Sequence, residues 1–156
     1  MALTFAERAA PDTPAAAYVV VYAKSDGLIY AKDDAGVERN VVPVAGTLTA
    51  TTSGTSIDFT GLPAGISRIT MNFSGVSTNG SSPLLIQIGD SGGIEATGYL
   101  GASCAFTLAA VGAANFTTGF GIRADLSAGA IRHGSIILTR IDAATFLWAA
   151  TGVIGC

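Results

Sequence analysis

The most constraining feature of this sequence is a strict alternation of apolar and polar residues over residues 68–74, Arg-Ile-Thr-Met-Asn-Phe-Ser. A period of two residues is typical of a β-strand with one buried face. The alternation therefore predicts a strand whose inward side chains are Ile69, Met71 and Phe73.

Glycine, proline and Asn-Gly turn signals lie on both sides of this strand, and they predict a series of short strands over residues 51–100. Gly and Pro interrupt the hydrogen-bond ladder of a strand, and both occur at 60–65, directly after the short alternating piece at 57–59. We expect further strands over residues 57–59, 84–88 and 94–100, with turns at 60–65, 79–80 and 89–93.

The composition supports an all-β fold. The chain has 156 residues, of which 20 are glycine, and short runs rich in Val, Ile and Thr recur along it. Charged residues make up 12%, below the usual ~25%, and 49% of residues are hydrophobic. Since this composition is more apolar than is usual for a soluble monomer, we expect part of the apolar surface to face another copy of the chain.

The charge and the N-terminus exclude several partners. A net charge of −3 and scattered Lys and Arg residues give no basic surface for nucleic acid. The uncharged run at 13–23 is too short to span a bilayer, and no secretion signal precedes it, so we expect synthesis in the cytoplasm without membrane insertion. Cys104 and Cys156 could pair, but we expect free thiols, with Cys104 acting as a small core residue.

The wording of several segments resembles a β-sandwich domain of bacteriophage tail-fibre and receptor-binding proteins. The segments that carry the resemblance are residues 52–63, 73–80, 97–99, 134–140 and 147–152. The resemblance implies an antiparallel, jelly-roll-like β-sandwich over residues 46–156. It also implies further strands beyond Gly152, so either the sandwich is completed differently here or the natural chain is longer.

Before the sandwich, the sequence predicts an extended N-terminal segment over residues 1–14. Residues 1–10 are Ala-rich and favour a short helical turn, although so short a helix needs a surface to dock against. Pro11 and Pro14 then fix an extended connector. We expect this segment to anchor the chain to other proteins of a virus particle.

Residues 15–45 predict a small β-meander, with strands at 17–24, 28–32 and 37–42 and turns at Asp26-Gly27 and 33–36. A meander of this size has too little core to stand alone. Its core could close around an axis against the same strands of neighbouring chains, through Val19, Val21, Leu28 and Tyr30. The Tyr-Ala-Lys and Asp-Gly wording is similar to hairpins in phage-fibre necks, which implies a trimeric collar.

After residue 100 the pattern predicts a mixed apolar run at 103–111, a turn at 125–129 and strands at 135–141 and 145–150. Phe116, Phe120 and Ile122 are expected to share one strand face. Trp148 is expected in the core, with an interface as the alternative.

Residues 89–93, Gly-Asp-Ser-Gly-Gly, match the pentapeptide around the nucleophilic serine of chymotrypsin-like proteases. That family has the chain order His, Asp, Ser, whereas His133, the only histidine, follows Ser91 here. Gly, Asp and Ser are also the residues that a hairpin turn prefers, so a turn is the better interpretation.

Other catalytic or metal sites are equally unsupported. His133 with Asp125 or Asp142 could form an acid–base pair, but residues 132–134 predict a polar loop or strand edge. Zinc needs several ligands with recognisable spacing, and the acidic residues Asp26, Asp33, Asp34 and Glu38 do not match a calcium-binding loop. We expect no enzyme activity, no metal and no cofactor.

The sequence therefore favours a structural protein of a virus particle, located in the virion: a homotrimeric phage fibre or fibre-like head or tail appendage. The alternatives are a capsid decoration protein and a soluble carbohydrate-binding module. Loops at the ends of a sandwich are the usual binding surface, and here they would contact a glycan or protein of the host cell. The candidate receptor contacts are Asn79, Ser81, Ser82, Asp90, Ser91 and Tyr99.

Overall fold

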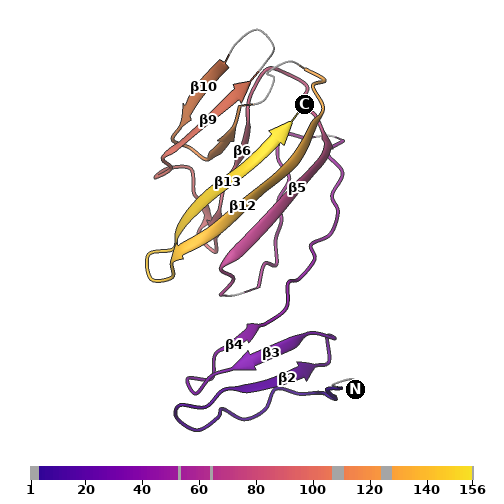
Figure 1. The fold of residues 1–156 in the computed structure, drawn as a ribbon, viewed down its shortest axis with the longest axis vertical. Coiled ribbons are helices and arrows are strands. Elements are labelled where there is room, and N and C mark those ends of the chain that lie inside the picture. The colour runs from indigo at the N-terminus through magenta and orange to yellow at the C-terminus, as the bar shows by residue number, and fades with distance from the viewer. Residues whose placement is uncertain (1–3, 53, 64, 107–110, 124–127, 156) are drawn as a thin grey trace. The chain divides into compact units, whose positions relative to one another are not determined.

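The computed structural model describes residues 4–52, 54–63, 65–106, 111–123 and 128–155. All of the regular elements in these ranges are β-strands, which confirms the all-β prediction (Figure 1). The strands form several small open sheets, and nearly all neighbouring strands are antiparallel. The chain divides into two compact units, Met1–Ile66 and Ser67–Cys156.

The first unit holds one four-stranded sheet in the order β1-β2-β3-β4. Its strands are β1 (Glu7–Arg8), β2 (Val20–Lys24), β3 (Ile29–Lys32) and β4 (Glu38–Asn40). The predicted meander and both of its turns are confirmed, since β2, β3 and β4 pair in sequence order. Gly27 and Gly36 have φ angles of 79° and 80°, a conformation that glycine adopts without strain.

The predicted helical turn over residues 1–10 is wrong where the structure describes it, from residue 4 onward. Glu7 and Arg8 instead form β1, which pairs in parallel with β2. A helix this short has no stability of its own, whereas docking on a sheet edge gives its backbone groups hydrogen-bond partners.

The predicted segments 1–14 and 15–45 both lie in the first unit, and so do residues 46–66 from the start of the predicted third segment. Residues 43–50 contain no strand, as expected for a connector. The boundaries at residues 14 and 45 stay predictions.

The largest sheet of the second unit has the order β13-β12-β5, and Figure 1 shows these strands side by side. They are β5 (Arg68–Val76), β12 (Arg132–Asp142) and β13 (Leu147–Gly155). The strands predicted at 68–74 and 135–141 are confirmed. The strand predicted at 145–150 begins two residues later and runs further, because Thr145 belongs to the turn and donates a hydrogen bond to Asp142.

The hydrophobic core of the second unit joins the three-stranded sheet to a pair formed by β6 (Leu84–Ile86) and β11 (Phe120–Ile122). Its buried members are Ile86, Ile122, Ile136 and Leu138. The side chains predicted to point inward from β5 pack against this cluster, and so does Trp148. Both predictions of core positions are therefore confirmed.

Two hairpins complete the described part of this unit. One pairs β7 (Gly89–Asp90) with β8 (Gly93–Ile94), and the other pairs β9 (Gly101–Phe106) with β10 (Val111–Phe116). The first confirms the turn predicted at residues 89–93. The predicted strand at 94–100 is mostly wrong, because the chain is irregular between β8 and β9.

Other predicted strands are wrong because a strand needs a neighbouring strand to pair with as well as an alternating sequence pattern. Residues 57–59 alternate but form no strand. Phe116 lies in β10, whereas Phe120 and Ile122 lie in β11, so the three share no strand. Of the turn predicted at 125–129 and the apolar run at 103–111, residues 125–127 and 107–110 lie outside the described residues.

Cys104 is exposed, so its predicted core position is wrong. In β9 the half-buried positions alternate with exposed ones, and Cys104 falls in the exposed register opposite Ala113. Cys156, its potential partner, lies outside the described residues.

The contact between Phe116 and Gly121 gives a test of this packing. A Cβ added at Gly121 would overlap the Phe116 ring. Gly121→Ala should therefore lower the free energy of unfolding by about 2 kcal/mol, a typical cost of overpacking, as measured by urea denaturation. Gly155→Ala is the matched control, because nothing lies within 4 Å of the added Cβ. Equal stabilities of the two variants would contradict the packing described here.

Candidate functional site

The first sheet has two chemically different faces. Directly paired residues of an antiparallel ladder share a face, and the ladder pairs Tyr22 with Tyr30 and Tyr30 with Asn40. It likewise pairs Lys32 with Glu38. We call this side the polar face, and its members are Val20, Tyr22, Lys24, Leu28, Tyr30, Lys32, Glu38 and Asn40.

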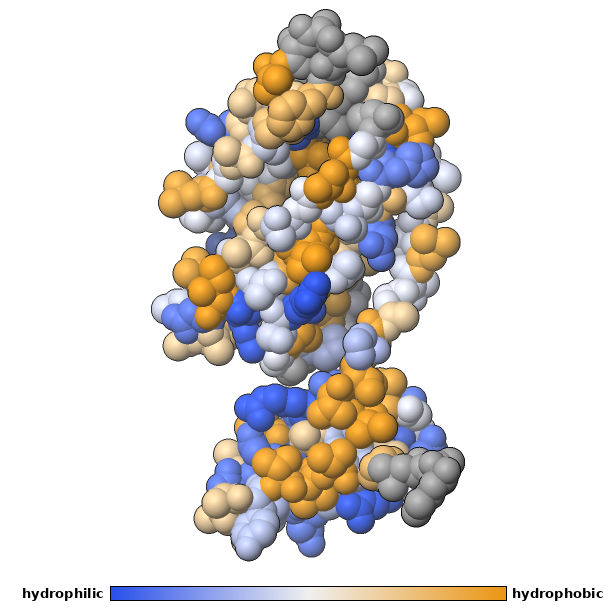
Figure 2. Space-filling model, in the orientation of Figure 1, coloured by the Kyte–Doolittle hydropathy of each residue, from blue (hydrophilic) through white to orange (hydrophobic). Residues whose placement is uncertain are grey.

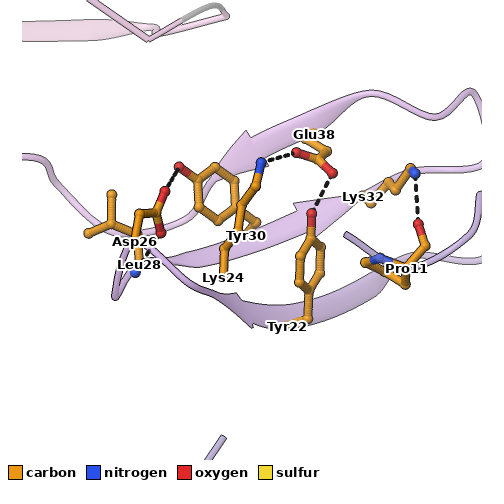
Figure 3. Close-up of polar contacts among 8 residues, drawn as sticks. All are labelled: Pro11, Tyr22, Lys24, Asp26, Leu28, Tyr30, Lys32 and Glu38. Carbon is orange, nitrogen blue, oxygen red and sulfur yellow. Dashed lines mark hydrogen bonds and ion pairs between the residues drawn. The ribbon is translucent and has the colours of Figure 1, made fainter. Parts of the chain in front are cut away.

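Side chains of the polar face form a connected hydrogen-bond network (Figure 3). Glu38 is its centre, since it accepts from the Tyr22 hydroxyl and forms an ion pair with Lys24, with Nζ and Oε2 2.8 Å apart. The Lys24 ammonium also lies 4.8 Å from the centre of the Tyr30 ring. Tyr30 in turn donates to Asp26 over 2.8 Å, so three strands and a turn are tied together.

These contacts move the pKa values of the groups involved. The hydrogen bond from Lys24 is the main cause that lowers the pKa of Glu38, and the Tyr22 hydroxyl adds to it. The same bond raises the pKa of Lys24. Burial, followed by the hydrogen bond to Glu38, raises the pKa of the Tyr22 phenol. The network is therefore most stable with Glu38 ionised and Lys24 and Tyr22 protonated.

The opposite side of the sheet carries aliphatic side chains. The ladder pairs Val21 with Ala31 and Ala23 with Ile29, and the Val41 amide donates to Ile29. We call this the apolar face, and its solvent-accessible aliphatic members are Val21, Ile29, Ala31, Val41 and Val19, which continues the alternation ahead of β2. Ala23 lies buried on the same side. Val19, Val21 and Val41 are 61%, 49% and 52% exposed. Figure 2 shows hydrophobic residues gathered on the surface of this unit.

The first unit buries few hydrophobic side chains of its own. Among its described residues, the buried hydrophobic side chains are Tyr22 and Ala23. Two charged residues lie on this side at the edge strands, where Glu7 of β1 pairs with Ala23 and Arg39 of β4 pairs with Ala31. The Arg39 guanidinium forms an ion pair with Asp33, with Nη1 and Oδ2 2.7 Å apart. The centre of the apolar face is left as an uncharged surface.

The four predicted collar residues fall on different faces. Val19 and Val21 lie on the apolar face, whereas Tyr30 stacks on Tyr22 on the polar face, with ring centroids 6.2 Å apart. Leu28 also lies on the polar side, beside Lys24. Sequence analysis did not name Ile29, Ala31 and Val41. Only the pairing register of the strands places these residues on the apolar face. The role of all of these residues in a trimer stays a prediction.

Three of the predicted receptor contacts, Asn79, Ser81 and Ser82, are exposed on the loop between β5 and β6. Hydrogen bonds within and below the loop fix its shape. The Thr78 hydroxyl donates to the Gly80 carbonyl over 2.9 Å, and the Thr78 carbonyl accepts from the Gly129 amide over 3.2 Å.

Arg132 lies fully buried beneath this loop. Its Nη1 is 3.4 Å from the Ala130 carbonyl and 3.5 Å from the Thr78 hydroxyl. Sequence analysis expected a polar loop or strand edge at residues 132–134, but these residues begin the central strand β12. The buried cation therefore braces the loop that carries the three exposed polar side chains.

Asp90, Ser91 and Tyr99 lie beyond β6, so β6 separates them in the chain from the first three candidates. Asp90 accepts the Gly92 amide over 2.6 Å and closes the hairpin turn. The Tyr99 hydroxyl accepts the Ile88 amide over 2.9 Å, and its ring meets Phe120 edge-on with centroids 5.0 Å apart. Tyr99 thus holds the chain between β6 and β9 in place.

The histidine predicted as a weak catalytic candidate has a structural partner. His133 Nδ1 accepts the Gly75 amide over 3.2 Å, beside a register shift between β5 and β12. Asp142 lies at the other end of β12, about 30 Å away at the rise of an extended strand. It accepts the Ala144 amide and the Thr145 hydroxyl. Asp125 lies outside the described residues.

Acidic residues of the first unit are used in turns. Asp26 accepts the Leu28 amide, Asp33 accepts the amides of Ala35 and Val37, and Asp34 accepts the Ala17 amide. Within the described ranges, no group of three or more His, Cys, Asp or Glu residues could hold a metal ion. Among the described residues there is no helical segment with the length and hydrophobicity needed to span a membrane.

The chain was compared with known proteins, and neither a family model, nor a curated protein, nor a solved structure matches it.

The Glu38 network gives a pH prediction. Because the pKa of Glu38 is lower in the folded chain than in the unfolded chain, its contribution to stability is present above the unfolded value of about 4.3. That contribution is lost as the pH falls through the folded value. NMR titration should show Glu38 with a midpoint below that of an unperturbed Glu.

Lys24→Met removes the main cause of the shift, so it should raise the Glu38 midpoint toward the ordinary value. A midpoint that is the same with and without Lys24 would rule out the ion pair as its cause.

Proposed function

We propose that this chain is a non-enzymatic structural protein of a bacteriophage particle. In this proposal it is a fibre or fibre-like head or tail appendage that assembles as a homotrimer and projects a β-sandwich for adhesion to the host. The observation that carries the proposal is the exposed apolar face of the first unit, whose centre carries no charge. The class of particle is proposed from the resemblance of several sequence segments to phage tail-fibre proteins.

Energetics support assembly of the first unit. Full burial of a valine side chain contributes about 1.5–3 kcal/mol, so burying a half-exposed one contributes roughly 1 kcal/mol. The three valines of the apolar face are each about half exposed or more, and therefore offer a few kcal/mol per chain on association. The described residues of this unit bury too few apolar side chains to form an ordinary core.

Adhesion is assigned to the second unit. We propose that its three-stranded sheet and the β6–β11 pair, which share one core, are the two layers of the sandwich. The loop with Asn79, Ser81 and Ser82 would contact a host glycan or protein. A braced loop loses little conformational entropy on binding, and three copies on one fibre raise the avidity of a weak contact.

The remaining parts of the chain follow from this arrangement. Residues 1–14 would attach the fibre to other proteins of the particle, and the assembled protein would be located in the virion. The chemistry is that of assembly and recognition, with no cofactor.

The solution mass tests the proposal directly. Light scattering across a dilution series should give three times the chain mass of 15.6 kDa, independent of concentration. A stable monomer at all concentrations would refute the fibre and favour a decoration protein that buries its apolar face on the capsid. The position of labelled protein on particles would then identify the attachment site.

The adhesion loop can be tested with the triple variant Asn79→Ala/Ser81→Ala/Ser82→Ala. Removing the three polar side chains should reduce binding of the labelled trimer to a panel of bacterial strains at least tenfold. The matched control is Thr117→Ala/Thr118→Ala, which changes an exposed loop between β10 and β11. Equal binding by both variants would remove the loop from the proposal. A glycan array reports whether the ligand is a sugar, and a flat result there counts against the carbohydrate-binding alternative.

A further inference from the structure

The two faces of the first sheet differ in what already covers them. The N-terminal segment lies along the polar face, where the Pro11 carbonyl accepts from the Lys32 ammonium over 2.8 Å (Figure 3). The Arg8 guanidinium lies 5.8 Å from the centre of the Tyr22 ring on the same side. The polar face therefore has contacts from the chain's own N-terminal segment, whereas the three valines of the apolar face are about half exposed or more.

We infer that the apolar face, formed by Val19, Val21, Ile29, Ala31 and Val41, is the surface through which copies of this chain contact one another. The polar face and the N-terminal segment then lie on the outside of the assembly. This inference rests on the proposed homo-oligomer and adds which side of the sheet forms its interface.

The chemistry of the face argues for a protein surface as its occupant. Its five members are aliphatic, and none has a side-chain hydrogen-bond donor or acceptor. A sugar or a nucleic acid is recognised through hydrogen bonds, stacking on aromatic rings or positive charge, and these members offer none of them. An apolar face of β-branched and small side chains is suited to pack against another apolar face.

The charge distribution argues that this other surface is the same face of a second copy. Where copies of one face converge on the axis of a homo-oligomer, identical groups come together, so any charge near the axis would meet its own like. The charges of the network, on Lys24, Lys32 and Glu38, all lie on the polar side. On the apolar side the register places two charged residues, Glu7 beside Ala23 and Arg39 beside Ala31. Both lie on edge strands, and Arg39 forms an ion pair with Asp33. The centre of the apolar face carries no charge, so identical copies can meet there without repulsion.

The experiment places a carboxylate on this face in the full chain, with Val21→Glu as the main variant. Val153→Glu is the matched control, because Val153 is 82% exposed in the second unit. Mass by light scattering is measured over a dilution series, and far-UV circular dichroism checks the fold. We expect Val21→Glu to dissociate within the dilution range over which the native chain keeps its mass, because a buried charge is costly and raises the apparent dissociation constant at least roughly 100-fold. Val153→Glu should keep the native mass over the same range.

A second variant keeps the test valid if Val21→Glu fails to fold. Val19→Glu changes a residue that precedes β2 and is more exposed than Val21, and it should weaken the oligomer in the same way. If the native chain is an oligomer and both folded variants keep its mass, the inference is wrong while the proposed fibre stands. If the native chain is a monomer, both are wrong.

Discussion

Ile136 and Leu138 are the positions on which the second unit depends. They lie in the central strand of its largest sheet, opposite Met71 and Ile69 on one side and Gly152 and Ala150 on the other. Because side chains alternate between the two faces of a sheet, this pairing places the inward side chains of all three strands in one layer. The β6–β11 pair packs Ile86 and Ile122 onto that layer. A shift of β12 by one residue would expose the whole set, so the pairing register and the core determine each other.

The first unit is held together by different interactions. Its described part buries little apolar surface, and its strands are instead joined on one side by Glu38, Lys24 and Tyr22. Hydrogen bonds of this kind fix geometry well but add little net stability, because the unfolded chain bonds to water. The unit therefore has a defined shape and an unused apolar surface.

Local sequence patterns predicted the elements whose formation depends on residues close together in the chain. The alternation at residues 68–74 identified β5 and its three inward side chains, and the glycine turns identified the meander and the hairpin at 89–93. Other features depend on pairing across the chain. The burial of Arg132 follows from its place beneath the loop at Thr78, which is 54 residues away. The two faces of the first sheet likewise follow from register, which a sequence specifies only indirectly.

The parallel pairing of β1 with β2 has a consequence for the order of events during protein synthesis. β1 leaves the ribosome before its partner β2, and Pro11 leaves it before Lys32, whose ammonium donates to the Pro11 carbonyl. Glu7 and Arg8 therefore have no final pairing until Ala23 and Lys24 have emerged. The hairpin of β2 and β3 can close on its own during that time, because its partners are close in sequence. β1 is thus added to the sheet after the two central strands, although it is synthesised before them.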